Sequence, residues 1–228
     1  MDLFRASLAT GKPDYDLCSS YRVCLETEFP NLRQRYHEKI TTTLLFPTTE
    51  LEDSFQLLLW DIRCYLEMVN SYGKAGYISL QRPLALYRNV IQHRLLSIDS
   101  DASKPVREIC RVALLFFSSV VVYPLQNQRP MLQYLHTLTN HLKSATHIED
   151  DFRLWLLVLG GMAANTDPLK PWYISQLRAL SVIYPRSWSS VRGLLEEFLW
   201  LESACGEGGL ELWLEVMLDA AMHQRVPH

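Results

Sequence analysis

The fold is decided by the stretch FRLWLLVLGGMAA, which runs from Phe152 to Ala164. Its uncharged part, residues 154–164, is well short of the ~20 residues that a membrane-spanning helix needs. A helix that is apolar on every side is buried inside a protein core. This stretch therefore predicts a buried core helix, and no membrane association is expected.

Two adjacent glycines, Gly160 and Gly161, lie inside this helical pattern. Glycine in a helix interior costs about 1 kcal/mol relative to alanine, so a neighbour is expected to approach this surface closely. Two candidates are considered for that neighbour: the backbone of another helix, and a flat ligand lying over the notch.

The rest of the chain has the same character, because apolar residues recur at spacings of three and four and strand-like alternation is almost absent. Its 228 residues, 48% of them hydrophobic, predict one all-α domain over residues 1–228 that is a bundle of about ten helices. The predicted helices are Asp14 to Glu28, Asn31 to Leu44, Glu50 to Ser71, Pro83 to Ile98, Ser103 to Tyr123, Pro130 to Ser144, Asp151 to Ala164, Pro168 to Ile183, Ser187 to Ala204 and Gly208 to Met222.

Charge and cysteine content narrow the partners and the compartment. The formal net charge is −3, so the chain lacks the positive field that drives contacts with DNA phosphates, and direct DNA binding is not expected. The five cysteines are scattered, with no spacing typical of a metal finger. They are interpreted as reduced thiols, and the opening residues do not resemble a secretion signal. A cytoplasmic or nuclear location is expected.

Sequence motifs for bound cofactors, metals and nucleophiles are missing. There is no G-x-S-x-G, no G-x-G-x-x-G and no G-x-x-x-x-G-K, so no cofactor is expected. His136, His141 and His147 share a region but lack helical ligand spacing, so no metal site is expected either. Of these, His141 lies nearest the apolar side of its helix and is a minor acid-base candidate. His93 is expected to project into solvent.

Asp61 is the first candidate for chemistry. It projects away from the side of its predicted helix that carries Gln56, Arg63, Glu67 and Asn70. A buried carboxylate either pairs with a cation or hydrogen-bond donors, or has its pKa raised until it is a usable acid or base. Buried acids are more often members of a satisfied polar network than catalysts. The apolar side on which Asp61 falls carries Leu57, Leu58, Cys64, Tyr65, Met68 and Tyr72.

Two further ionisable residues are predicted to lie inward. Glu202 projects onto the apolar side of the helix predicted over residues 187–204, where a structural role is expected. Arg111 lies on a helix that is otherwise apolar, and a buried guanidinium requires a carboxylate partner. A core ion pair of Arg111 with Asp61 or Glu202 is therefore predicted. The same arginine is also suited to bind the oxygen atoms of an acidic ligand.

Aromatic residues are abundant, with six tryptophans and eleven tyrosines. Such side chains usually fill space, but they also line cavities that accept an aromatic molecule. If this chain has such a cavity, Asp61 and Arg111 are its predicted catalytic residues. The predicted substrate-binding residues are Tyr65, Ser118, Trp155, Gly160 and His141.

The last predicted helix has one apolar and one acidic side. Glu211, Glu215 and Asp219 are expected to face solvent, and the opposite side is expected to pack on the body of the protein. Structural closure of the domain is the favoured role for this helix. The residues expected to be buried are Leu210, Trp213, Leu214, Met217 and Ala221.

Four segments together resemble the C-terminal helical regulatory domain of fungus-specific transcription factors. They are FRLWLLVLGGMAA at residues 152–164, PWY at 171–173, FLWLESAC at 198–205 and LELWLEV at 210–216. The resemblance covers about residues 107–216, and it includes the arginine at position 111 and the acid two residues after Trp200. It implies an all-α regulatory domain. The six-cysteine zinc cluster that reads DNA in such proteins has no counterpart here.

Three functions are consistent with these features. The favoured one is a stand-alone protein of fungal secondary metabolism that binds a small aromatic or polyketide-like molecule and catalyses a cofactor-free cyclisation or isomerisation. In it Asp61 is the acid or base and Arg111 stabilises an oxyanion. It is favoured because the chain looks self-contained. The alternatives are an interaction protein, namely a truncated regulator that pairs with intact zinc-cluster transcription factors, and a degenerate product without a ligand. A homo-oligomer is the other protein partnership considered.

Overall fold

The computed structural model describes most of the chain after residue 50. Over the described residues the chain is entirely helical, with eight α-helices and no strand, which confirms the predicted all-α class. The helices predicted over residues 14–28 and 31–44 lie outside the described residues. The described residues are 46, 51, 53–75, 81–101, 103–122, 128–145, 147–165, 167–184 and 187–223.

The helices belong to two compact units. The first comprises residues 1–43 and 47–134, and the second comprises residues 44–46 and 135–228. The helices of the first unit are α4 (Asp53–Ala75), α5 (Gln81–Leu96) and α6 (Pro105–Phe117), which continues into the π-helical segment η3 (Ser118–Val122). Those of the second unit are α8 (Asp150–Ala163), α9 (Lys170–Leu180), α10 (Trp188–Glu196) and α11 (Glu202–His223), and α7 (Gln128–Ser144) passes from one unit to the next.

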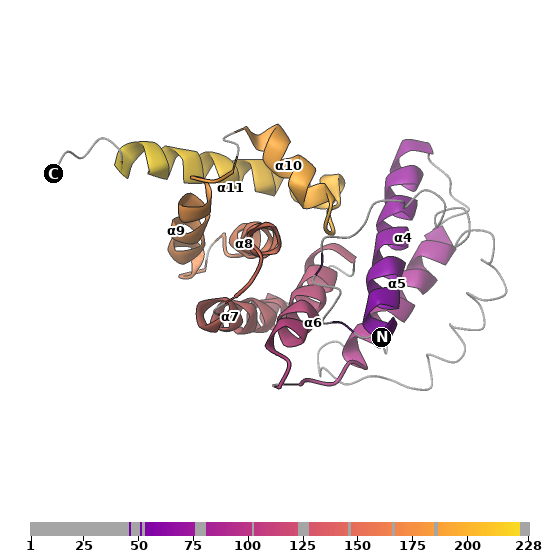
Figure 1. The fold of residues 1–228 in the computed structure, drawn as a ribbon. Helices are drawn as coiled ribbons and strands as arrows, with labels where there is room; N and C mark the ends of the chain where they lie inside the picture. Colours follow the sequence, from indigo (N-terminus) through magenta and orange to yellow (C-terminus); the bar gives the residue numbers. More distant parts are fainter. Residues whose placement is uncertain are drawn as a thin grey trace. The chain divides into compact units, whose positions relative to one another are not determined.

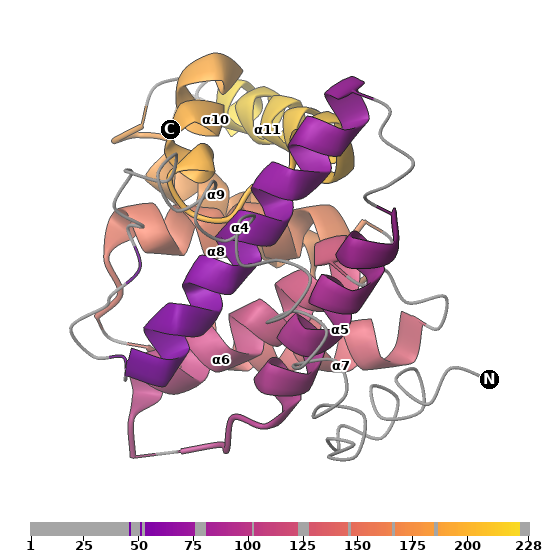
Figure 2. The same cartoon turned by 90° about the vertical axis from the view of Figure 1, so that its right-hand side faces the viewer.

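In the first unit α4 and α5 pack side by side, as Figure 2 shows, and α5 also contacts α6. Helix α6 begins at Pro105, where the missing amide hydrogen costs nothing because the first turn has no acceptor for it. Its residues from Arg107 to Phe117 are buried except at Arg111. A helix buried on nearly all sides is what the apolar run in this region predicts.

Helix α8 is the core of the second unit, in which it contacts α9, α10 and α11 (Figure 1). Phe152 and every residue from Leu154 to Gly161 are buried, as predicted for this stretch. The Trp155 indole N–H donates to the Leu199 carbonyl oxygen over 2.8 Å, so its polar atom is satisfied. Its ring stacks on Phe152 and Phe198, with centroids 5.9 and 6.0 Å away.

The helix predicted over residues 187–204 is two helices. Helix α10 ends at Glu196, and a bend over residues 197–201 precedes α11. The bend is apolar and buried from Phe198 to Leu201, so the hydrophobic pattern continues although the helix does not. None of the helices in the described ranges combines the length and the hydrophobicity that crossing a bilayer requires.

Candidate functional site

Asp61 lies in α4 and is buried as predicted, with 5% of its surface exposed. Both of its carboxylate oxygens are engaged by α5. The Tyr87 hydroxyl donates to Oδ1 over 2.9 Å, and the Arg94 guanidinium forms an ion pair with Oδ2. Tyr87 and Arg94 lie seven residues apart, which is two turns, so they present both groups on one side of α5. Asp61 is thus part of a network that ties α4 to α5.

Aromatic and sulfur-containing side chains pack around this network. Tyr87 contacts a cluster of Cys64 and Met68, together with Trp60 and Leu84. The Tyr65 ring lies 6.4 Å from that of Tyr87, and its hydroxyl donates to the Val122 carbonyl oxygen over 3.5 Å. Burial raises the pKa of Tyr65, and the positive charge of Arg88 opposes that shift. Tyr65 is therefore neutral near pH 7.

One predicted neighbour of Asp61 lies elsewhere. Leu57 is 51% exposed, so the prediction that it shares the buried side of this helix was wrong. Its neighbours Leu58 and Leu59 are each only 1% exposed, so the buried side of α4 at this turn is the one that they occupy.

Ser118 stands at the start of the π-helical segment and is fully buried. Its hydroxyl donates to the Gln92 side-chain carbonyl on α5. Gln92 is also fully buried, and its Nε2 has no hydrogen-bond partner. One turn earlier, the buried Oδ1 of Asn89 has no partner either. The side of α5 near Ser118 therefore carries an unsatisfied donor and an unsatisfied acceptor inside the first unit.

His93 belongs to the same buried polar side of α5. It is 6% exposed, so the prediction that it projects into solvent was wrong. Its Nδ1 lies 3.4 Å from the Ser97 hydroxyl oxygen. The error arises because α5 turns polar side chains inward, which a hydrophobic pattern does not reveal.

Arg111 pairs with Glu108, and the predicted ion pair of Arg111 with Asp61 or Glu202 was wrong. Arg111 Nε and Nη2 lie 2.9 and 2.7 Å from the Glu108 carboxylate oxygens, three residues earlier on α6. The Arg111 side chain is only partly buried, with 18% of its surface exposed. A bidentate contact with a near neighbour uses the fork geometry of the guanidinium without a partner from another helix.

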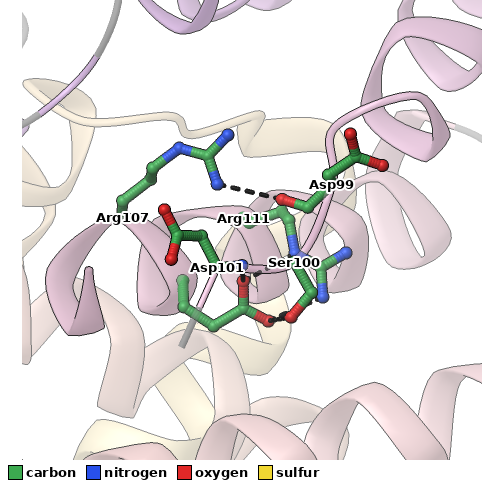
Figure 3. Close-up of polar contacts among 6 residues, drawn as sticks. Asp99, Ser100, Asp101, Arg107 and Arg111 are labelled. Atoms are coloured by element: carbon green, nitrogen blue, oxygen red, sulfur yellow. Dashed lines mark hydrogen bonds and ion pairs between the residues drawn. The ribbon is translucent and has the colours of Figure 1, made fainter. Parts of the chain in front are cut away.

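Glu108 is the centre of a small network where α6 begins; Figure 3 labels its partners Ser100, Asp101 and Arg111. Besides Arg111, it accepts from the Ser100 hydroxyl over 3.1 Å and from the Asp101 backbone N–H over 3.4 Å. Burial alone would raise the pKa of Glu108. The hydrogen bonds and positive charge of Arg111, with the bond from Ser100, outweigh burial and hold that pKa below its usual value.

A further hydrogen bond holds the residues that precede α6. Arg107 Nη1 donates to the Asp99 carbonyl oxygen over 2.9 Å (Figure 3). The residues before α6 are thus fixed by side chains from the first turn and a half of that helix.

In the second unit the notch at Gly160 is filled by Tyr173 of α9. A Cβ atom added at Gly160 would lie 2.5 Å from both Cζ and Oη of that tyrosine. The neighbour is therefore a side-chain ring of the chain itself, and neither of the two predicted candidates was right. The Tyr173 hydroxyl lies 2.7 Å from the Thr139 hydroxyl of α7, and burial raises the pKa of Tyr173 to about 12.

Glu202 is exposed, which overturns its predicted place on an apolar helix side. It is the first residue of α11, where a carboxylate is favoured by the helix dipole. One of its oxygens accepts from the Trp200 indole N–H over 2.9 Å, and the other lies 3.5 Å from Arg192. Glu202 therefore joins the bend to the helix at the surface.

His141 is partly buried in the last turn of α7, and its acid-base role stays a prediction. The described residues contain no group of three His, Cys, Asp or Glu side chains able to hold a metal ion. The predicted site residues divide between the units. Asp61, Tyr65, Arg111 and Ser118 lie in the first, and Trp155, Gly160, His141 and Glu202 lie in the second.

Comparison with known proteins gives no match. No protein-family model, no curated protein and no solved structure matches this chain.

The sequence analysis missed four partners of the predicted residues: Tyr87, Arg94, Glu108 and Gln92. Three of them had a detectable signal. Tyr87 and Arg94 repeat at an interval of seven, and Glu108 precedes Arg111 by three, a spacing at which opposite charges pair on a helix. Gln92 had none, because glutamines are usually exposed.

Proposed function

We propose that this chain is a helical regulatory module of the transcription-factor type, which acts by binding a protein partner and does not read DNA itself. The tryptophan-anchored segments between residues 152 and 216 support the resemblance to such modules. The observation that carries the proposal is that both residues predicted to be catalytic are already engaged by other side chains of the chain. Asp61 is held by Tyr87 and Arg94, and Arg111 is held by Glu108.

These contacts weigh against catalysis for a geometric reason. A general base must reach the substrate proton within about 3 Å, directly or through one water molecule. Each carboxylate oxygen of Asp61 already accepts from a side chain of α5. An oxyanion likewise needs donors aimed at it, and Arg111 Nε and Nη2 are both directed at Glu108. Catalysis would require both ion pairs to open, at a cost that a structural role avoids.

A tethering experiment tests this function. The full chain is fused to an unrelated DNA-binding module, and transcription of a reporter with the matching site is measured. We expect the fusion to change reporter output relative to the DNA-binding module alone, and Asp61→Asn to have this effect only as far as it lowers the amount of folded protein. An inert fusion, together with turnover of a hydroxylated aromatic substrate by the free chain, would contradict the proposal.

A second candidate function is the binding of a small aromatic or polyketide-like molecule in the first unit. The unsatisfied buried atoms Gln92 Nε2 and Asn89 Oδ1 favour it, since a ligand that both accepts and donates would satisfy them. In this candidate Asp61 remains the acid or base of a cofactor-free cyclisation or isomerisation. Hydroxylated aromatics should then raise the melting temperature of the wild type. They should not stabilise Gln92→Leu, and equal responses of the two proteins would exclude this site.

A further inference from the structure

The exposed side of α11 carries a row of leucines. Leu210, Leu214 and Leu218 are 39%, 53% and 65% exposed and follow one another at intervals of four residues. Residues at this spacing lie on one side of a helix. Helices α8 and α9 both contact α11 (Figure 1), and Leu212, which is buried, packs against Gly161 of α8. The leucines therefore form one apolar strip that the described residues of the second unit leave uncovered.

The buried side of α11 shows why this strip is turned outward. It is formed by Gly209, Leu212, Trp213 and Val216, all of which are buried. A Cβ atom at Gly209 would lie 2.6 Å from Cη2 of Trp188, so the absence of a side chain there lets the indole approach. The prediction that Leu210 and Leu214 are buried was wrong. The buried side of α11 is rotated from the predicted side by roughly the angle between two successive residues of a helix.

Acidic residues accompany the strip. Helix α11 contains five carboxylates and no lysine or arginine. Glu215 and Asp219 are paired with Lys170 and Arg178 of α9, over 2.9 and 2.6 Å. The remaining acids are Glu202, already described, and Glu207 and Glu211.

Glu207 and Glu211 differ from the paired acids. Both are exposed, and neither forms an ion pair with any residue of the described ranges. Glu207 precedes Leu210 by three residues and Glu211 precedes Leu214 by three, so both acids lie on the same side of the helix as the leucines. The strip is thus bordered by negative charge that no described residue of the second unit neutralises.

We infer that this side of α11, defined by Glu207, Leu210, Glu211, Leu214 and Leu218, binds an amphipathic helix of another protein. That helix has an apolar row flanked by lysine or arginine. The inference rests on the proposed function, because it names the partner chemistry of a protein-binding module. Apolar residues at helical spacing are how one helix docks against another, and complementary charge fixes orientation and excludes wrong partners.

A second copy of the chain fits this surface less well. Two α11 helices would bring carboxylates together with no basic residue of either helix to neutralise them. Three half-exposed leucines also offer only a few hundred Å2, well below the roughly 800 Å2 per partner that a specific stable interface buries. A modest, transient contact with a basic helix is what charge and area together support.

The test uses two synthetic peptides of roughly 20 residues, a length at which an isolated helix forms to a useful extent. Both carry leucines at positions a and d of each heptad. One has lysine and the other glutamate at the flanking positions. Binding of each labelled peptide to the full chain is followed by fluorescence anisotropy. We compare the wild type with Leu214→Ala/Leu218→Ala, which keeps good helix formers in α11.

The matched control is Leu57→Ala, since Leu57 of α4 is 51% exposed and Leu214 is 53% exposed. We expect the lysine peptide to bind the wild type and the control equally, and to lose about tenfold or more in affinity for the double variant. Glu207→Gln/Glu211→Gln should weaken binding and flatten its dependence on salt. Circular dichroism should show equal helix content in all variants.

Other outcomes overturn the inference. They are equal binding of the two peptides, a loss in Leu57→Ala as large as in the double variant, and self-association that only the leucine substitutions abolish. A chain that regulates the tethered reporter but binds neither peptide also overturns it, while leaving the proposed function in place. A chain that binds the lysine peptide through α11 but leaves the reporter unchanged supports the surface and contradicts the regulatory function.

Discussion

Replacing Gly160 with alanine should destabilise the second unit, although alanine is the better helix former. In an exposed helix this substitution stabilises by about 1 kcal/mol. At Gly160 the new Cβ would lie 2.5 Å from Cζ and Oη of Tyr173, where ordinary contacts begin near 3.4 Å. Tyr173 is fully buried and hydrogen-bonded to Thr139, so its ring cannot move away without disturbing that contact and its buried surroundings.

The net effect follows from three contributions. Overpacking a filled core costs about 1–3 kcal/mol. A weakened hydroxyl contact with Thr139 adds roughly 0.5–1.5 kcal/mol, and the helix preference offsets about 1 kcal/mol. Gly160→Ala should therefore lower the free energy of unfolding by about 0.5–3.5 kcal/mol.

Urea denaturation followed by circular dichroism measures this difference. Gly193→Ala on α10 is the matched control, because nothing lies within 4 Å of its added Cβ and the residue is exposed. That control should gain up to about 1 kcal/mol. A double-mutant cycle tests the contact directly. Gly160→Ala should cost less stability when it is introduced into Tyr173→Leu than when it is introduced into the wild type. If Gly160→Ala matches or exceeds the wild type in stability, the close packing of Tyr173 on α8 is refuted.

Three further predictions concern charge. Asp61→Asn should lower the free energy of unfolding by roughly 1–3 kcal/mol in urea titrations, less than for a fully buried pair because Arg94 is 35% exposed; no change would mean that the pair contributes nothing. Glu108 has a lowered pKa in the folded chain, so its contribution to the free energy of unfolding is complete above the ordinary glutamate pKa and is lost as pH falls through the pKa of the folded chain. The stability of Glu108→Gln, measured as a function of pH in the acid range, should lack this pH-dependent contribution. Tyr173 has a pKa raised to about 12, so its contribution is complete below pH 10 and falls as pH rises toward 12; Tyr173→Phe should flatten the alkaline part of the stability curve, and an unchanged slope would contradict the burial of this hydroxyl.

The helical pattern predicted that Asp61 faces inward, but it did not predict which residues Asp61 contacts. Projection onto a helix says which side a residue occupies, and Asp61 indeed lies inward. Its cation comes from α5, and periodicity carries no information on which helix packs against which. The prediction for Arg111 was wrong for the opposite reason, because its partner is a near neighbour in sequence. Its partner is three residues away, and the search for a distant acid overlooked Glu108.

Helix ends and glycines limited the rest of the prediction. The chain leaves the helical path between Glu196 and Glu202 without proline or glycine, so an apolar pattern that continues through the bend masks the break. The buried side of α11 depends on Gly209 admitting Trp188, which no count of apolar residues includes. Both errors concern where a helix starts or how it is rotated, and the helical class itself was predicted correctly for the described residues.

Because the tryptophans are unevenly distributed between the units, fluorescence and circular dichroism report on different parts of the chain. Trp60 belongs to the first unit, whereas Trp155, Trp172, Trp188, Trp200 and Trp213 all belong to the second. Emission excited near 295 nm, where tryptophan dominates absorption, is therefore weighted toward the melting of residues 135–228. Ellipticity follows the helices of both units. Superimposable curves from the two signals would mean that the units unfold as one cooperative body, and separated curves would assign the earlier step to one of them.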